Sequence, residues 1–188
     1  MSSRAIRLAA ALLILAASRL GLADSAGGGF KSDVLASIDD AGKKLVDLAQ
    51  AMPAEKFGWR PASGVRSVSE VYVHVAAGNY FLPTFVGVKR PEGMDRTMET
   101  KITEKSQVID TLKKSIAHLK NAVEGVPDAD LDKPVKFFGR DLTERAILLH
   151  AVNHMHEHLG QSIAYARMNG VVPPWSESES APKKSSAP

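Results

Sequence analysis

Apolar residues recur every three or four positions in four long stretches of the chain, which is the spacing of amphipathic helices. The predicted helices cover residues 32–52, 67–88, 103–125 and 142–169, and the second either ends near Pro83 or is kinked there and continues to about residue 88. The second opens on a capping box, Ser67-Val68-Ser69-Glu70, and the first and last are stopped by Pro53 and Gly170. Because no segment alternates convincingly between apolar and polar residues, the pattern predicts an all-α fold, a four-helix bundle.

The predicted connections differ in character. Residues 53–64 form a loop held down by Phe57 and Trp59, and residues 89–101 are polar and irregular. Residues 131–141 make a long, turn-rich crossover between the third and fourth helices, with a short extended piece near 135–138.

The first 23 residues have the layout of a secretory signal peptide. Two arginines precede an apolar run over residues 8–17, and small residues at Gly21 and Ala23 suit cleavage after Ala23. The run is too short for a stable membrane span, so we expect none in the mature chain; the alternative is an uncleaved N-terminal anchor. The prediction is a protein exported to the periplasm or secreted.

The remaining chain fits one domain. Residues 24–31 are predicted to be a flexible leader and residues 32–175 the bundle. Residues 176–188 are rich in Ser, Glu, Pro and Lys, which predicts a disordered tail.

Charge and cysteine content exclude several functions. The full chain has 24 Lys and Arg against 21 Asp and Glu, but three arginines leave with the signal peptide, so the mature chain is balanced. We therefore expect no nucleic-acid partner and no attraction to anionic membranes. The absence of cysteine excludes disulfides, thiolate ligands and a cysteine nucleophile.

Histidines provide the candidate chemistry. His150, His154 and His158 are spaced by four residues and share one face of the last helix, whereas His156 points away. His74 lies on the apolar face of the second helix. Imidazoles that project inward from two helices can hold one ion, so we predict a divalent metal site formed by His74, His154 and His158.

Histidines on helices also occur without a metal, and other metal motifs have their own spacing. Single core histidines are often hydrogen-bonded without a metal, but three unpartnered imidazoles on buried faces would cost several kcal/mol. The His-Glu-x-x-His motif of zinc proteases is absent, as is the paired Glu-x-x-His pattern of carboxylate-bridged di-iron bundles.

The chain resembles the DinB/YfiT-like superfamily of metal-binding four-helix bundles over most of residues 33–175. The segments that carry the resemblance are residues 57–61, 67–74, 154–161 and 165–175. The superfamily pattern has one ligand on the second helix and two on the fourth, which corresponds to His74, His154 and His158. Where many relatives have arginine this chain has Leu159, so no role for that arginine is carried over.

Neighbouring residues could support these ligands. Gln161 could brace a ligand ring and Gly160 could allow close helix approach, although both could be packing residues. Glu70 could orient His74 or act as a base, although its capping role explains it equally. His150 could support the site from nearby, fill the core or be a fourth ligand; His118 and His156 are expected to be solvated.

The resemblance implies a metal-dependent enzyme, a transferase or hydrolase that activates a bound thiol or water for a small-molecule substrate. The ion would be Zn²⁺ or Ni²⁺, with iron and manganese as further candidates. Because thiol cofactors belong to reducing compartments, the predicted export favours water, yet the sequence supplies no clear general base. The alternative is a non-catalytic metal-binding or structural bundle. Superfamily members frequently form homodimers.

Overall fold

The computed structural model describes residues 29–176. The predicted signal peptide lies outside the described residues, as do residues 24–28 of the leader and residues 177–188 of the tail.

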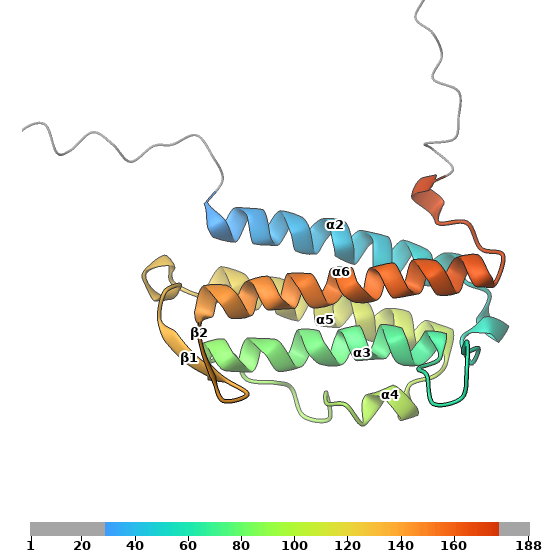
Figure 1. Ribbon diagram of the computed structural model, residues 1–188, viewed down its shortest axis with the longest axis horizontal. Coiled ribbons are helices and arrows are strands. Elements are labelled where there is room, and N and C mark those ends of the chain that lie inside the picture. Colours follow the sequence, from blue (N-terminus) through green and yellow to red (C-terminus); the bar gives the residue numbers. More distant parts are fainter. Residues whose placement is uncertain (1–28, 177–188) are drawn as a thin grey trace, which may run out of the picture.

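Four long helices form the bundle, which confirms the predicted fold class (Figure 1). Their bounds are α2 Phe30–Ala51, α3 Val68–Phe81, α5 Lys105–Gly125 and α6 Glu144–Met168. Helix α2 begins two residues earlier than the apolar spacing predicted. The predicted capping box is present at α3, where Ser67 Oγ accepts from the Glu70 N–H and Glu70 Oε2 accepts from the Ser67 N–H.

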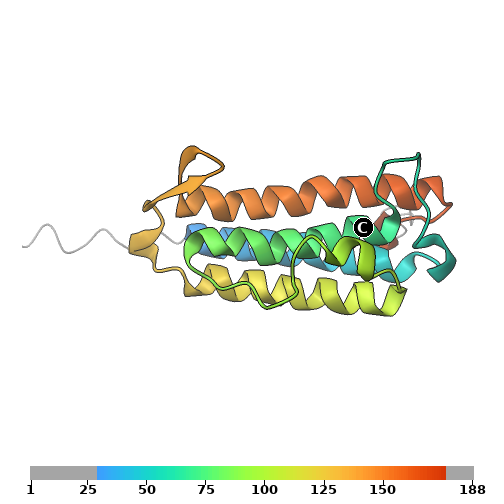
Figure 2. The same ribbon diagram turned by 90° about the horizontal axis from the view of Figure 1, so that it is seen from below.

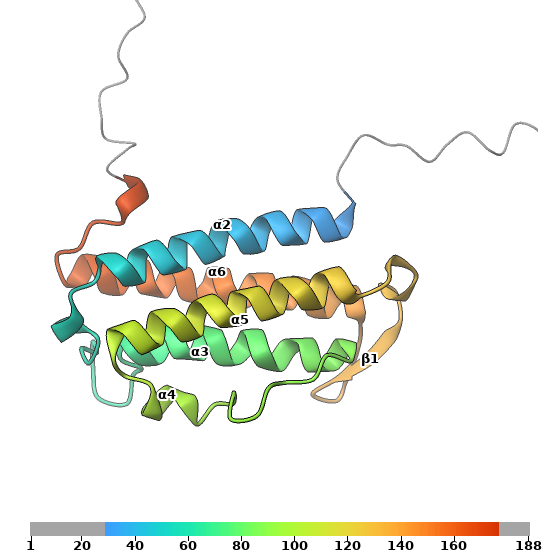
Figure 3. The ribbon, with the colours of Figure 1, turned by 180° about the vertical axis from the view of Figure 1, so that it is seen from behind.

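The helices are arranged so that α2 and α3 each pack against both α5 and α6. Figures 2 and 3 show that α3 and α5 run in the same direction, as do α2 and α6. A short turn cannot join two parallel helices, so the chain returns along the length of the bundle between α3 and α5. Among the described residues no helix is long and apolar enough to cross a membrane.

This return connection covers the outer side of α3 (Figure 2). It begins with the 3-10 helix η3 (Leu82–Val86) and ends with the short helix α4 (Met98–Lys101). The sequence predicted an irregular polar segment here, but Met98 is only 3% exposed. Because α5, α6 and this connection surround α3, its consecutive residues Val71, Tyr72 and Val73 are all buried, and its buried surface is wider than the predicted apolar stripe.

The connection between α5 and α6 stays at one end of the bundle (Figure 1). It holds the 3-10 helix η4 (Asp128–Asp130) and an antiparallel hairpin of β1 (Pro134–Phe137) and β2 (Arg140–Thr143). The predicted extended piece is thus one strand of a hairpin. Thr143, the last residue of β2, is also the N-cap of α6, and its hydroxyl accepts from the Ala146 N–H. At the other end, the 3-10 helix η2 (Ala54–Lys56) leads into the loop where Trp59 packs edge-on against Tyr165 at 5.4 Å.

Candidate metal centre

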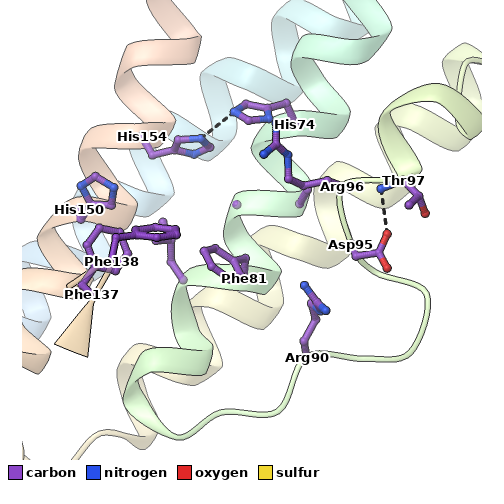
Figure 4. Close-up of a pocket in the computed structure, with 13 residues that line it drawn as sticks. His74, Phe81, Arg90, Asp95, Arg96, Thr97, Phe137, Phe138, His150 and His154 are labelled. Carbon is purple, nitrogen blue, oxygen red and sulfur yellow. Dashed lines mark hydrogen bonds between the residues drawn. The ribbon is translucent and has the colours of Figure 1, made fainter. Parts of the chain in front are cut away.

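Three histidines from two antiparallel helices converge inside the bundle. His154 and His158 lie one turn apart on α6, and His74 faces them from α3. Each offers one ring nitrogen, and these three atoms lie within 4.8 Å of one another. The Nε2 atoms of His74 and His154 are 3.2 Å apart (Figure 4). The three imidazoles predicted to share a site do come together.

The His154 ring reaches this position because α3 has a glycine opposite it. A Cβ placed on Gly78 would lie 2.5 Å from Cε1 of His154, well inside contact distance. Any side chain at residue 78 would therefore push the ring away from the other two. Gly160, which the sequence suggested for close helix approach, is exposed and has open space where its Cβ would be.

A partly buried carboxylate orients His74. Glu99 of α4 places Oε1 2.7 Å from Nδ1 of His74, and its other oxygen accepts from Nε of Arg66 at 2.8 Å. Burial alone would raise the pKa of Glu99, but the hydrogen bonds from Arg66 and His74 outweigh burial and hold the pKa below its usual value. Glu99 is therefore ionised and can only accept, so Nδ1 of His74 carries the proton.

An amide plays the same part for His158. Oε1 of Gln161 accepts from Nδ1 of His158 at 2.8 Å, and Nε2 of Gln161 donates to the hydroxyl of Tyr165 at 3.0 Å. With Nδ1 protonated, His158 keeps a lone pair on Nε2. His74 and His158 thus both present an unprotonated Nε2, the form in which imidazole binds metals.

His154 is the most deeply affected of the three rings. Burial, followed by the charges of the neighbouring His158 and His74, lowers the pKa of His154 to about 3. The ring is therefore neutral at neutral pH. Its Nδ1 is buried and is one of three buried side-chain atoms in the described residues with no hydrogen-bond partner. Burial also lowers the pKa of His74, against the opposing hydrogen bond to Glu99.

A cavity of about 550 Å³ opens beside His74 and His154 (Figure 4). It lies between α3, α6, the hairpin and the return connection, and its size is typical of small-molecule sites. His150 lines the cavity one turn before His154, where its exposed ring packs against Phe137 at 5.1 Å. This position makes His150 a neighbour of any cavity occupant.

The contacts of Glu70 and of His118 decide two further expectations from the sequence. The acid beside His74 is Glu99, whereas Glu70 caps α3 and pairs with Arg60 at 3.1 Å. His118, expected to be solvated, packs against Tyr80 at 5.1 Å with its Nε2 buried and unpartnered. His156 is exposed, as expected.

Sequence reasoning missed Glu99 because residues 89–101 contain no long apolar repeat. A weaker signal was present: Met94, Met98 and Ile102 are spaced by four residues and all pack against the core. That spacing indicates one apolar face on a short helical piece. The contact between Gly78 and His154 has no signal in the sequence, because it joins two helices that meet only in three dimensions.

The chain belongs to the DinB family, whose model matches residues 25–184. A four-helix fold with a three-histidine cluster is what the sequence resemblance implied. No curated protein matches the chain.

Three solved bacterial structures share the fold. A DinB-like protein of Bacillus cereus is 20% identical with a TM-score of 0.67, over 75% of this chain and 93% of its own. A DinB-like protein of Bacillus subtilis is 20% identical with a TM-score of 0.59, over 73% and 92%. A conserved protein of Enterococcus faecalis is 18% identical with a TM-score of 0.61, over 72% and 94%.

The packing of Gly78 against His154 gives a test with an internal control. We expect Gly78→Ala to destabilise the protein by about 1–3 kcal/mol, because the added methyl group must displace a buried ring. Gly160→Ala should instead stabilise it by about 0.5–1 kcal/mol, since alanine favours helix and the site is open. Denaturant unfolding of both variants measures the difference. Equal effects of the two substitutions would contradict the close approach.

Proposed function

We propose that His74, His154 and His158 bind one divalent metal ion through their Nε2 atoms. The donor set supports this proposal. Two nitrogens bound about 2.0–2.1 Å from one tetrahedral ion lie about 3.3 Å apart, and the His74 and His154 Nε2 atoms are separated by 3.2 Å. Three imidazoles suit Zn²⁺, Ni²⁺ or iron, and with no thiolate or carboxylate in the set we favour Zn²⁺ or Ni²⁺.

The surrounding hydrogen bonds support the same conclusion. Glu99 and Gln161 hold the Nδ1 protons of two rings, which fixes the tautomer that a metal needs. An ionised carboxylate that accepts from a histidine also makes that ring a stronger ligand. The low pKa of His154 keeps the third ring neutral, so it adds no positive charge that would repel a metal ion.

We further propose that the protein is a metal-dependent transferase or hydrolase. The observation that carries this proposal is the cavity that borders two of the three histidines. Three protein ligands leave a coordination position open, as in catalytic rather than structural zinc sites. A divalent ion held there would lower the pKa of a bound water or thiol. The chain itself would orient the substrate in the cavity, with His150 on its wall near the reacting groups.

Export remains part of the proposal. The basic start, the apolar run over residues 8–17 and the small residues before position 24 support a cleaved signal peptide. In an oxidising compartment, water is more available as a nucleophile than a small thiol cofactor is. We therefore favour hydrolysis over thiol transfer.

Metal content tests the ligand set. The mature protein, purified without chelator and dialysed against Zn²⁺ or Ni²⁺, should retain one ion per chain by elemental mass spectrometry. Replacing any one of His74, His154 or His158 by alanine should remove it, because two ligands hold an ion far more weakly than three. His156→Ala, on the exposed side of α6, is the matched control and should keep the ion. Wild-type protein without metal, and with stability unchanged on adding one, would refute the site.

Glu99 should tune the affinity without being a ligand. Glu99→Gln preserves shape but removes the charge that His74 donates to, so we expect metal affinity to fall by about 10–100-fold. Glu157→Gln, at an exposed acid beside His158 in the sequence, should leave it unchanged. Competition with a chromophoric chelator measures both. Equal affinities for the two variants would show that Glu99 does not support the site.

An open coordination position separates an enzyme from a structural metal protein. The Co²⁺-substituted protein should show the visible absorption of a four-coordinate ion, and adding azide should shift that spectrum as the anion replaces a bound water. A spectrum insensitive to azide, in protein that holds one ion per chain, would indicate a closed site and overturn the catalytic proposal while leaving metal binding intact.

A further inference from the structure

The cavity beside the histidines has walls of two different chemistries. One wall is apolar and is formed by Phe81 of α3 together with Phe137 and Phe138 of the hairpin. These rings contact one another, with centroids of Phe137 and Phe138 at 4.7 Å and of Phe81 and Phe138 at 6.1 Å. The opposite wall is the return connection, which contributes Arg90 and Arg96 (Figure 4).

Phe138 is poorly explained by folding alone. Its side chain is among the large apolar ones left exposed, at 75%, and its backbone is in the left-handed region at φ 48°. Gly139 follows at φ 80°, and Phe137 pairs with Arg140, so the hairpin has a two-residue turn with both φ values positive. Such turns favour Asn-Gly, and a bulky residue in the first position costs free energy. An exposed ring in a strained turn at a cavity wall points to ligand contact.

The positive charges of Arg90 and Arg96, on the opposite wall, are available to an anion in the cavity. Within the described residues Arg90 is exposed and makes no ion pair. Arg96 is 81% exposed, with Nε 4.0 Å from Oε1 of Glu99, an oxygen already engaged by His74. The one acid on the cavity wall is Asp95, whose carboxylate accepts from the Thr97 N–H at 2.8 Å. Two guanidinium groups thus face the cavity against one carboxylate.

We propose that the occupant of this cavity is a small molecule with an apolar, ring-sized body and one anionic group. The body would lie on Phe81, Phe137 and Phe138, and the anion would be bound by Arg90, with Arg96 beside it. Guanidinium groups bind carboxylate, sulfonate and phosphate alike through paired N–H donors. The inference rests on the proposed function, because it names the substrate class that would meet the metal.

Two dyes with the same ring system test the proposal. 8-Anilinonaphthalene-1-sulfonate and N-phenyl-1-naphthylamine differ only by the sulfonate, and both report burial by fluorescence. Titrations use the full protein, with and without Zn²⁺. Arg90→Gln should weaken the sulfonate dye by about tenfold, the loss expected for one charge-assisted contact, and leave the neutral dye unchanged. Lys89→Gln is the matched control, an exposed cation next in sequence that does not line the cavity.

Phe138→Asn tests the apolar wall. Asparagine suits the turn, so the thermal midpoint should be equal to or above that of the wild type, while both dyes bind about tenfold more weakly because a ring contact is lost. A lower midpoint would show that Phe138 serves folding, and unchanged dye affinities would show that the wall is unused. Equal effects of Arg90→Gln and Lys89→Gln on the affinity for the sulfonate dye would show that Arg90 contributes only general positive charge and does not bind the anion.

The outcomes also separate this inference from the proposed function. In one outcome the protein holds one metal ion and yet shows no preference for the sulfonate dye over the neutral one. That result would leave the metal site intact and refute the proposal of an anionic substrate. Selective dye binding by protein that holds no metal supports the cavity chemistry and refutes the metal centre. A test series of aryl carboxylates and aryl phosphates, competing against the sulfonate dye, then distinguishes the two sources of negative charge.

Discussion

The close approach of α6 to α3 is the constraint on which the rest of the site depends. The ring of His154, on α6, occupies the space that a side chain at Gly78 of α3 would fill. Only from that position can it meet the ring of His74, which lies one turn before Gly78 on α3. The contact is partly buried and borders the cavity, but core residues of both helices flank it, among them Val75 and Met155, so the rings cannot move apart without disturbing packing. A cluster built on rigid helices in this way is preorganised before any ligand arrives.

The polar groups around the cluster reduce the cost of burying it. Burial of imidazole is expensive when its two nitrogens lack partners, yet two of the three rings have one nitrogen satisfied by Glu99 or Gln161. Those partners are themselves held, Glu99 by Arg66 and Gln161 by Tyr165. The Nε2 atoms of His74 and His154 share a hydrogen bond at 3.2 Å, and the Nδ1 atom of His154 is the one nitrogen of the cluster that is buried without a partner. In the proposed metal-bound protein, the ion would replace the proton that the two Nε2 atoms share.

Much of this arrangement could be predicted from the sequence, and the reason is periodicity. The four helices follow from apolar spacing, and the candidate ligand histidines follow from a four-residue repeat on α6 and a position on the apolar face of α3. Glu99 could not be predicted in the same way, since it lies on a four-residue helix with only a weak apolar repeat, and the contact of that helix with α3 forms only in the folded chain. The same holds for the hairpin, where local propensity disfavours phenylalanine in the turn and the aromatic cluster with Phe81 and Phe85 forms only after folding.

The connection from α3 to α5 contributes both Glu99, which contacts a histidine ring, and the arginines on the cavity wall. Apart from a few anchors such as Met98, it lies outside the helix core, and surface connections tolerate substitution, insertion and deletion better than packed helices. Selectivity in this fold can therefore diverge through one segment while the bundle and its histidines stay unchanged. A protein of this construction can acquire new ligands during evolution at little cost in folding stability.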